Sequence, residues 1–130
     1  MATAGARRVG VTGLLDTNVA LYLLGGKLAA ALPAADYGVS VITEMELLCW
    51  PSLTAEEETR LNVFLSHVIV CNLTPEIRRQ AVRLRRDERL KLPDAIVCAT
   101  ALEHGVELWT NDRRLAKVSG LVCRSVSLRA

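Results

Sequence analysis

The chain has 130 residues, of which 51% are apolar and 23% are charged, and its formal net charge is only +2. This length suits one compact domain with a sizeable core, and the composition argues against wholesale disorder. The small net charge gives no sign of nucleic-acid binding through bulk electrostatics, although local basic patches can still bind phosphates.

The cysteines and the apolar segments indicate the compartment. Four cysteines stand singly in apolar stretches, with no CxxC pair or zinc-type spacing: Cys49, Cys71, Cys98 and Cys123. We interpret them as small core residues in a reducing compartment. The apolar run near the N-terminus is too short for a signal peptide, and no segment reaches the roughly 18 apolar residues of a membrane span. We therefore expect a cytoplasmic protein that does not enter a membrane.

The first part of the chain alternates short strands with helices. Residues 9–15 form a β-branched and apolar run that predicts a buried strand. Residues 18–33 predict one or two short helices, broken at Gly25–Gly26. A second strand is expected over 37–42, followed by a helix over 43–50 that the next residue, a proline, stops.

The middle of the chain carries two helices around a third strand. Thr54 and Glu57 have the spacing of a capping box and begin a helix that runs to about Ser66. Residues 68–73 predict a strand. A long basic helix then covers residues 75–90, with a threonine cap and a proline at its first position.

The last part contains the most apolar helix of the chain. It is expected over 94–104 and is followed by Gly105 as a terminator. A strand over 106–110, a short helix over 112–118 and an edge strand over 121–127 complete the pattern.

This alternation predicts an α/β fold of three layers, α/β/α, with a mainly parallel sheet of four to five strands. We expect residues 1–130 to form a single domain, with residues 1–8 as a loose N-terminal tail.

Two acidic residues directly follow predicted strands. Asp16 ends the first strand in LLDTN, and Asp112 follows the fourth in LWTND. Each by itself is an ordinary turn or helix-cap residue. Sites in parallel sheets lie beyond the carboxyl ends of the strands, so two such acids on one sheet can converge.

A third acid is expected from the helix over 43–50. In the segment ITEMELLCW, a helix with about 100° per residue brings Ile42, Met45 and Cys49 together in one apolar arc. Glu46 falls about 65° from the centre of that arc and Glu44 about 135°. We therefore expect Glu44 to be solvated and Glu46 to border the buried face, where a carboxylate needs a partner such as a metal ion.

Asp94 opens the apolar stretch LPDAIVCATAL and is expected as the first residue of a central helix. A helix-cap role alone would explain it. Together with the other acids, however, it suggests a carboxylate cluster, which would repel itself without a cation. Hard oxygen ligands of this kind suit Mg²⁺ or Mn²⁺.

Three segments together resemble the PIN-domain family, specifically the VapC-like toxins of bacterial type II toxin–antitoxin pairs: LLDTNV, VSVITEMELL and LKLPDAIVCATALEHGVELWTND. The resemblance extends from about Val9 to about Ser127. The segment RRLAKVSG after the last acid departs from the family pattern, because it lacks the aromatic residue that often follows there.

The resemblance implies a Mg²⁺- or Mn²⁺-dependent endoribonuclease. Its catalytic, metal-binding acids would be Asp16, Glu46, Asp94 and Asp112. Polar support would come from Thr17, Asn18, Thr110 and Asn111. The resemblance also implies a homodimer and an antitoxin partner that blocks the site.

Basic residues offer candidate contacts to the phosphates of an RNA substrate. They are Arg85, Arg86, Arg89, Arg113 and Arg114. Ordinary solvated surface charge is the alternative explanation for them. No histidine is placed as a general base, since His67 and His104 fall near predicted helix ends.

Two other functions stay open at the level of sequence. One is a non-catalytic RNA- or protein-binding module on a PIN-like fold. The other is a phospho-receiver-like domain, which fits poorly because the first strand ends in one aspartate rather than an acidic pair.

Overall fold

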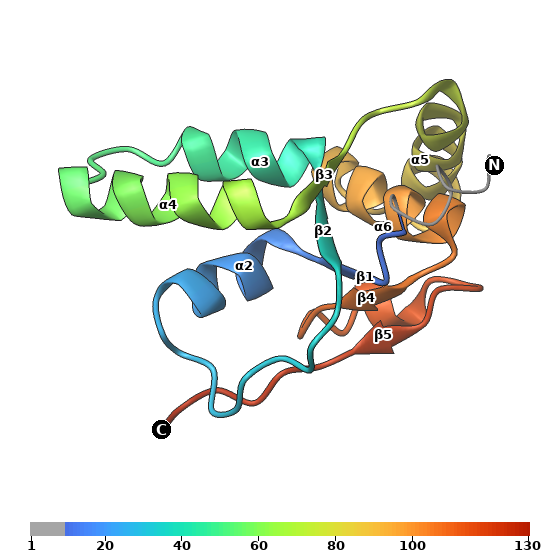
Figure 1. Ribbon diagram of the computed structural model, residues 1–130. Helices are drawn as coiled ribbons and strands as arrows, with labels where there is room; N and C mark the ends of the chain where they lie inside the picture. The colour runs from blue at the N-terminus through green and yellow to red at the C-terminus, as the bar shows by residue number, and fades with distance from the viewer. Residues whose placement is uncertain (1–9) are drawn as a thin grey trace, which may run out of the picture.

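A single five-stranded sheet, parallel throughout, forms the centre of the molecule (Figure 1). The computed structural model describes residues 10–130, so the expected tail over 1–8 and the first residue of the expected strand 9–15 lie outside the described residues. The order of the strands across the sheet is β3-β2-β1-β4-β5. Their bounds are β1 Gly13–Leu15, β2 Tyr37–Ser40, β3 Ile69–Cys71, β4 Glu107–Trp109 and β5 Cys123–Arg124.

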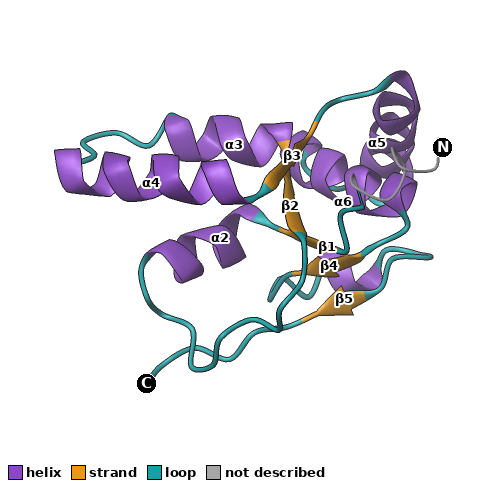
Figure 2. Cartoon of the chain, viewed as in Figure 1, coloured by secondary structure: helices purple, strands orange, loops and turns teal. Residues whose placement is uncertain are grey.

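Helices connect the strands and cover both faces of the sheet (Figure 2). Their bounds are α2 Thr17–Leu24, α3 Val41–Leu48, α4 Ala55–His67, α5 Pro75–Asp87 and α6 Leu92–His104, with a short 3₁₀ turn, η1, over Leu115–Lys117. The predicted three-layer α/β/α architecture is confirmed.

Neighbouring residues of each strand point to opposite faces and build two separate cores. Leu14 and Leu108 pack into the large apolar cluster formed with α5 and α6. Leu15 and Trp109, one position further along the same strands, pack into a smaller cluster with Val19 of α2. Both faces of these strands are therefore buried, as in other parallel sheets covered by helices.

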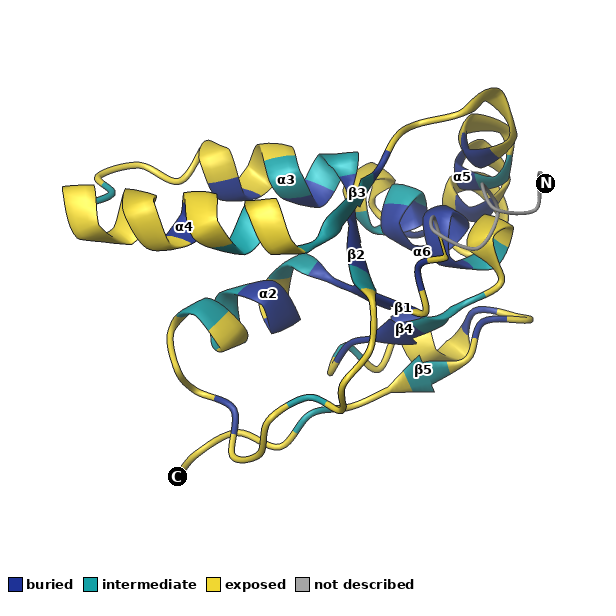
Figure 3. Cartoon of the chain, viewed as in Figure 1, coloured by how far each residue is buried: buried dark blue, intermediate teal, exposed yellow. Residues whose placement is uncertain are grey.

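Helix α6 is the central helix that the sequence predicts (Figure 3). Six of its residues are buried: Ala95, Val97, Cys98, Ala99, Thr100 and Ala101. It ends at Gly105, whose φ of 65° is the left-handed conformation that favours glycine. Its start differs from the prediction, because the helix begins at Leu92 after Lys91, and Asp94 is therefore in the first turn and does not cap it.

Of the one or two short helices expected within 18–33, one forms, and it ends at the predicted break. After α2 ends at Gly25, the chain instead pairs with the C-terminal segment, where Leu28 bridges Leu128 in antiparallel fashion. The Ala29 N–H donates to the Ser127 carbonyl at 2.8 Å. The pairing of these distant segments provides backbone hydrogen bonds that a helix would otherwise have provided.

Several predicted boundaries also shift. The strand expected over 37–42 ends at Ser40, because the Ser40 hydroxyl accepts a hydrogen bond from the Ile42 N–H and starts α3 two residues early. Helix α5 ends before Leu90, which is buried in the core instead. The expected helix 112–118 is reduced to the 3₁₀ turn η1, and the expected strand 121–127 to the two residues of β5.

The capping box, the cysteines and the apolar segments were also predicted from the sequence. The Thr54 capping box is present as expected. Of the four cysteines, Cys71 and Cys98 are buried, whereas Cys123 is half-buried and Cys49 is exposed, so the core interpretation is wrong for Cys49. Among residues 10–130, no helix is long and apolar enough to cross a membrane.

The close packing of β2 can be tested at Gly38. A Cβ at this position would meet the Val11 Cγ2 atom at 2.5 Å and the Ile69 backbone oxygen at 3.0 Å. We expect Gly38→Ala to lower the free energy of unfolding by about 1–3 kcal/mol, measured by urea denaturation. Gly13→Ala is the control, because its Cβ would meet only side-chain atoms of Trp109 and Tyr37, at 3.1–3.3 Å. An equal or larger loss for Gly13→Ala would contradict this account of the sheet.

Candidate active site

The site begins where β1 and β4 end side by side. These strands are parallel, with Leu15 opposite Trp109, and the Asp16 N–H donates to the Trp109 carbonyl at 3.1 Å. Asp16 therefore leaves the sheet next to Thr110. The Thr110 hydroxyl in turn accepts a hydrogen bond from the Asp112 N–H at 3.0 Å. This register brings the two acids that follow predicted strands to the same edge of the sheet.

Asp16 is a buried carboxylate, only 6% exposed. It caps α2, because it accepts a hydrogen bond from the Val19 N–H at 2.7 Å. Burial raises the pKa of Asp16 above its ordinary value, while hydrogen bonding to Thr110 and Val19 opposes that rise. The charges of Asp112 and Asp94 raise the pKa further, so the three carboxylates lie within electrostatic reach of one another.

Glu46 joins this edge through α2. The Thr17 hydroxyl donates to the Glu46 Oε1 atom at 2.7 Å, and it also lies 3.0 Å from the Thr43 hydroxyl. The Glu46 charge contributes to the raised pKa of Asp94. Thr43 is a contact that the sequence patterns did not single out, because a lone threonine in a helix carries no chemical signal.

The predicted orientation of α3 is wrong. Its buried residues are Thr43 and Leu47, whereas Met45 is 53% exposed. Glu46 is exposed and Glu44 is half-buried, the reverse of the expectation. The error arises because α3 packs against α2, α4 and α6, so its buried side is set by those neighbours and not by the most apolar arc.

Asp94 and Asp112 are linked by an arginine. The Arg114 Nη2 atom lies 2.8 Å from the Asp112 Oδ2 atom and 3.5 Å from the Asp94 Oδ2 atom. Hydrogen bonding to Arg114 lowers the pKa of Asp112. Burial is the main cause of the raised pKa of Asp94, and Arg114 opposes it. The two acids therefore share one counter-charge.

The predicted supporting residues separate into two groups. Thr17 and Thr110 contact the acids, as described above. Asn111 instead holds the C-terminal segment, because its amide exchanges hydrogen bonds of 2.8 and 3.0 Å with the Val126 backbone. Asn18 is exposed and makes no side-chain hydrogen bond within the described part of the chain.

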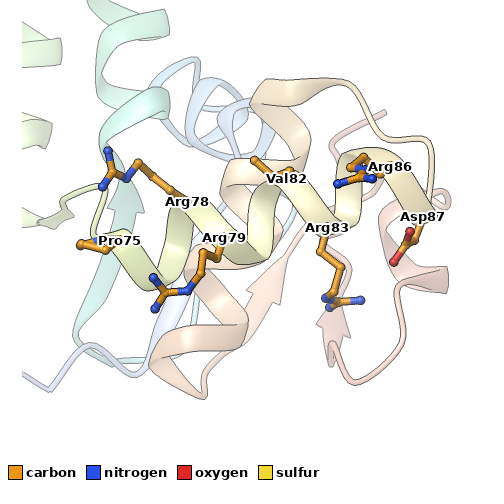
Figure 4. A pocket seen from close by; sticks show the side chains of 7 residues that line it. All are labelled: Pro75, Arg78, Arg79, Val82, Arg83, Arg86 and Asp87. Atoms are coloured by element: carbon orange, nitrogen blue, oxygen red, sulfur yellow. The ribbon is translucent and has the colours of Figure 1, made fainter.

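The candidate phosphate-binding arginines lie on the surface. Arg85 and Arg86 are exposed in the last turn of α5, and Arg89 is exposed in the loop that leads to α6 and Asp94. The helix carries further arginines towards its start. Figure 4 shows Arg78, Arg79, Arg83 and Arg86 projecting around Val82 on the outer side of α5. Arg113, beside Asp112, is also exposed.

The chemistry of the four acids fits a hard divalent cation. All four donors are carboxylates, the ligands that Mg²⁺ and Mn²⁺ prefer. Among residues 10–130, no three acidic, histidine or cysteine side chains already converge as a ready-made metal cage. The carboxylates are instead bound to internal donors: Val19 N–H, Thr17 and Arg114. Binding a cation therefore requires side chains at this edge to move.

Comparison with known proteins agrees with this fold. The family model of the PIN domain matches residues 13–121. A chain of a toxin–antitoxin complex from Klebsiella pneumoniae is 34% identical, with a TM-score of 0.71 over 85% of this chain and 96% of that one. No curated protein matches.

Two further solved structures share the fold at lower identity. One is VapBC2 from Rickettsia felis bound to a promoter DNA fragment, at 14% identity and a TM-score of 0.72 over 90% of this chain and 100% of that one. The other is VapBC-1 from nontypeable Haemophilus influenzae, at 18% identity and a TM-score of 0.71 over 88% and 98%. The chain belongs to the PIN-domain family. The resemblance to its VapC-like members, which the sequence indicates, is confirmed.

The opposite pKa shifts of Asp16 and Asp112 predict opposite effects on stability. Because the pKa of Asp16 is raised in the folded state, the unfolded chain loses this proton first as pH rises above 3.8. The folded state therefore loses stability between 3.8 and its own higher pKa. The lowered pKa of Asp112 contributes stability above 3.8, and this is lost as pH falls towards the folded pKa. In metal-free protein at pH 7, we expect Asp16→Asn to be more stable than wild type and Asp112→Asn to be less stable.

Urea denaturation in EDTA at pH 7 and pH 4 measures both effects. Asparagine caps helices as well as aspartate does, so Asp16→Asn keeps the α2 cap. The gain from Asp16→Asn should shrink at pH 4, because the folded-state pKa of Asp16 lies above 3.8. The loss from Asp112→Asn should largely remain at pH 4 and fade only at lower pH, because the folded-state pKa of Asp112 lies below 3.8. A destabilised Asp16→Asn protein at pH 7 would contradict the prediction.

Proposed function

We propose that this protein is a metal-dependent endoribonuclease that hydrolyses RNA phosphodiester bonds and acts as the toxin of a toxin–antitoxin pair. One observation carries the proposal: in a PIN-domain chain, Asp16, Glu46, Asp94 and Asp112 approach one another at the carboxyl edge of the sheet. Their mutual repulsion calls for a cation.

Each group has a role in this proposal. Asp16, Glu46, Asp94 and Asp112 hold Mg²⁺ or Mn²⁺. When bound, such an ion offsets the charge of the phosphodiester and activates a water molecule for attack. Thr17 orients Glu46 through its 2.7 Å hydrogen bond, and Thr110 orients the backbone of Asp112. Buried Asp16 provides a fixed anchor, because the α2 cap restrains its carboxylate.

The catalytic role of the acids is tested by substitution. We expect Asp16→Asn and Asp94→Asn each to abolish Mg²⁺- or Mn²⁺-dependent RNA cleavage, by at least about 100-fold, because each removes a negative ligand from the cation. Cleavage of a labelled RNA by purified protein measures this, and circular dichroism checks that the fold is intact. Asp36→Asn is the matched control, since Asp36 is exposed and directly precedes β2 at the opposite edge of the sheet.

The outcome separates the two remaining functions. Cleavage at the wild-type rate by either site variant would remove the assigned site. RNA binding by wild type without any metal-dependent cleavage would instead favour the non-catalytic binding module.

Exposed arginines support the choice of RNA as substrate. Arg85, Arg86 and Arg89 lie on the segment that leads into α6, and Arg113 is adjacent to Asp112. Guanidinium groups bind phosphates through paired hydrogen bonds. Arg114 would reach a phosphate only after it releases Asp94 and Asp112.

Salt dependence tests the contacts near the site. We expect a variant with three changes, Arg85→Gln, Arg86→Gln and Arg89→Gln, to bind RNA with a weaker dependence on salt. If each arginine contacts a phosphate, the plot of log binding constant against log salt concentration becomes less steep by roughly 2 for single-stranded RNA. Fluorescence anisotropy with catalytically inactive protein measures the slope. The charge-matched control is Arg78→Gln/Arg79→Gln/Arg83→Gln, which changes three arginines nearer the start of the same helix. Equal slope changes for both variants would reject a contact specific to the site end.

An antitoxin partner is proposed because the similar structures include toxin–antitoxin complexes. An apolar groove between α2, α3 and α4 supports a protein partner, with Leu24, Leu47, Trp50 and Leu61 among its lining. Trp50 is 54% exposed there.

We further propose a homodimer and a cytoplasmic location, where RNA is accessible. A neighbouring gene for a short DNA-binding protein distinguishes a toxin from a solitary nuclease.

A further inference from the structure

Arg114 is the most heavily engaged basic side chain near the acids. Its backbone N–H donates to the Asp112 Oδ1 atom at 2.9 Å, and its Nε and Nη2 atoms donate to the two carboxylate oxygens at 3.2 and 2.8 Å. The same Nη2 atom lies 3.5 Å from the Asp94 Oδ2 atom. The guanidinium therefore joins an acid that follows β4 to an acid in the first turn of α6.

The neighbouring arginine does not share this role. Arg113 is exposed and makes no ion pair or side-chain hydrogen bond within residues 10–130. The two arginines are adjacent in the chain and carry the same charge, but only one of them is directed into the carboxylate edge.

The position of Arg114 matches what a cation does at such a site. It neutralises part of the charge of Asp94 and Asp112, which otherwise repel each other and Asp16. It also occupies carboxylate oxygens that a metal ion would need, which agrees with the lack of a ready-made cage among the described residues.

We propose that Arg114 is the built-in counter-cation of the metal-free site, so that a divalent ion binds by exchange with its guanidinium. This inference rests on the proposed function, since it assumes the metal site. The side chain of Arg114 is 59% exposed, and its long stem allows it to turn towards solvent. The backbone N–H bond to Asp112 remains when the guanidinium leaves, so that the carboxylate stays oriented.

The exchange affects both the metal affinity of the protein and the stability of its metal-free form. Metal affinity is lower than four carboxylates alone would give, because the ion competes with a covalently attached cation. The metal-free protein is more stable than four unpartnered acids would allow, because the arginine offsets their repulsion.

The test compares Arg114→Gln with Arg113→Gln in the full chain. Both changes remove one positive charge, but only the first removes the competitor. We expect Arg114→Gln to bind Mn²⁺ about three- to tenfold more tightly than Arg113→Gln by isothermal titration calorimetry. In EDTA, we expect Arg114→Gln to unfold at lower urea concentration than Arg113→Gln, and saturating Mn²⁺ should close this gap.

The outcomes distinguish the inference from the proposed function. Equal or weaker Mn²⁺ binding by Arg114→Gln, with binding present in wild type, overturns the exchange and leaves the nuclease proposal standing. The absence of Mn²⁺ binding in all variants overturns the metal site and the inference with it. If Arg114→Gln does not fold without metal, Arg114→Lys is tested instead. We expect Arg114→Lys to bind Mn²⁺ more tightly than Arg113→Gln does, because lysine lacks the paired donors that hold Asp112.

Discussion

Carboxylates gathered at one edge of the parallel sheet repel one another, and the contacts around them offset that repulsion. Parallel strands bring all their carboxyl ends to one edge, and here Asp16 and Asp112 leave adjacent strands in register. Asp94 and Glu46 are added by helices. Burial and neighbouring charge raise the pKa of Asp16 and of Asp94. Only donors and cations can keep such a cluster ionised, and hydroxyl groups, a helix N-terminus and Arg114 supply part of that need.

The frame beneath this edge is rigid, whereas the edge itself can adjust. The middle of helix α6 is buried in the large core directly after Asp94, so the backbone of Asp94 is held in place. Asp16 is fixed by the α2 cap. Glu46, by contrast, is exposed, and Arg114 has most of its side chain in solvent. A cation can therefore be accommodated by moving side chains while the fold stays unchanged.

Two other surfaces lie on different sides of the same sheet. The arginines of α5 belong to the layer that contains α6, and the apolar groove belongs to the layer of α2, α3 and α4 (Figure 1). The acidic edge lies between these layers. This separation would let the proposed RNA approach along one layer while the proposed protein partner binds the other. The net charge is only +2 because acids elsewhere in the chain offset the arginines of α5.

The layered fold, the central apolar helix and the Thr54 capping box could be predicted from the sequence, because periodicity and turn chemistry are local properties. Motif spacing likewise named the four candidate acids, whose role stays a prediction. The three-dimensional structure was needed to show that residues 27–29 pair with 127–129 and that Val41 and Ile42 belong to a helix. The same holds for α3, which buries Thr43 and Leu47 in place of its most apolar arc. The structure also shows that Arg114 reaches Asp94 as well as Asp112. These features depend on contacts between segments far apart in the chain, and no local pattern records which segments will meet.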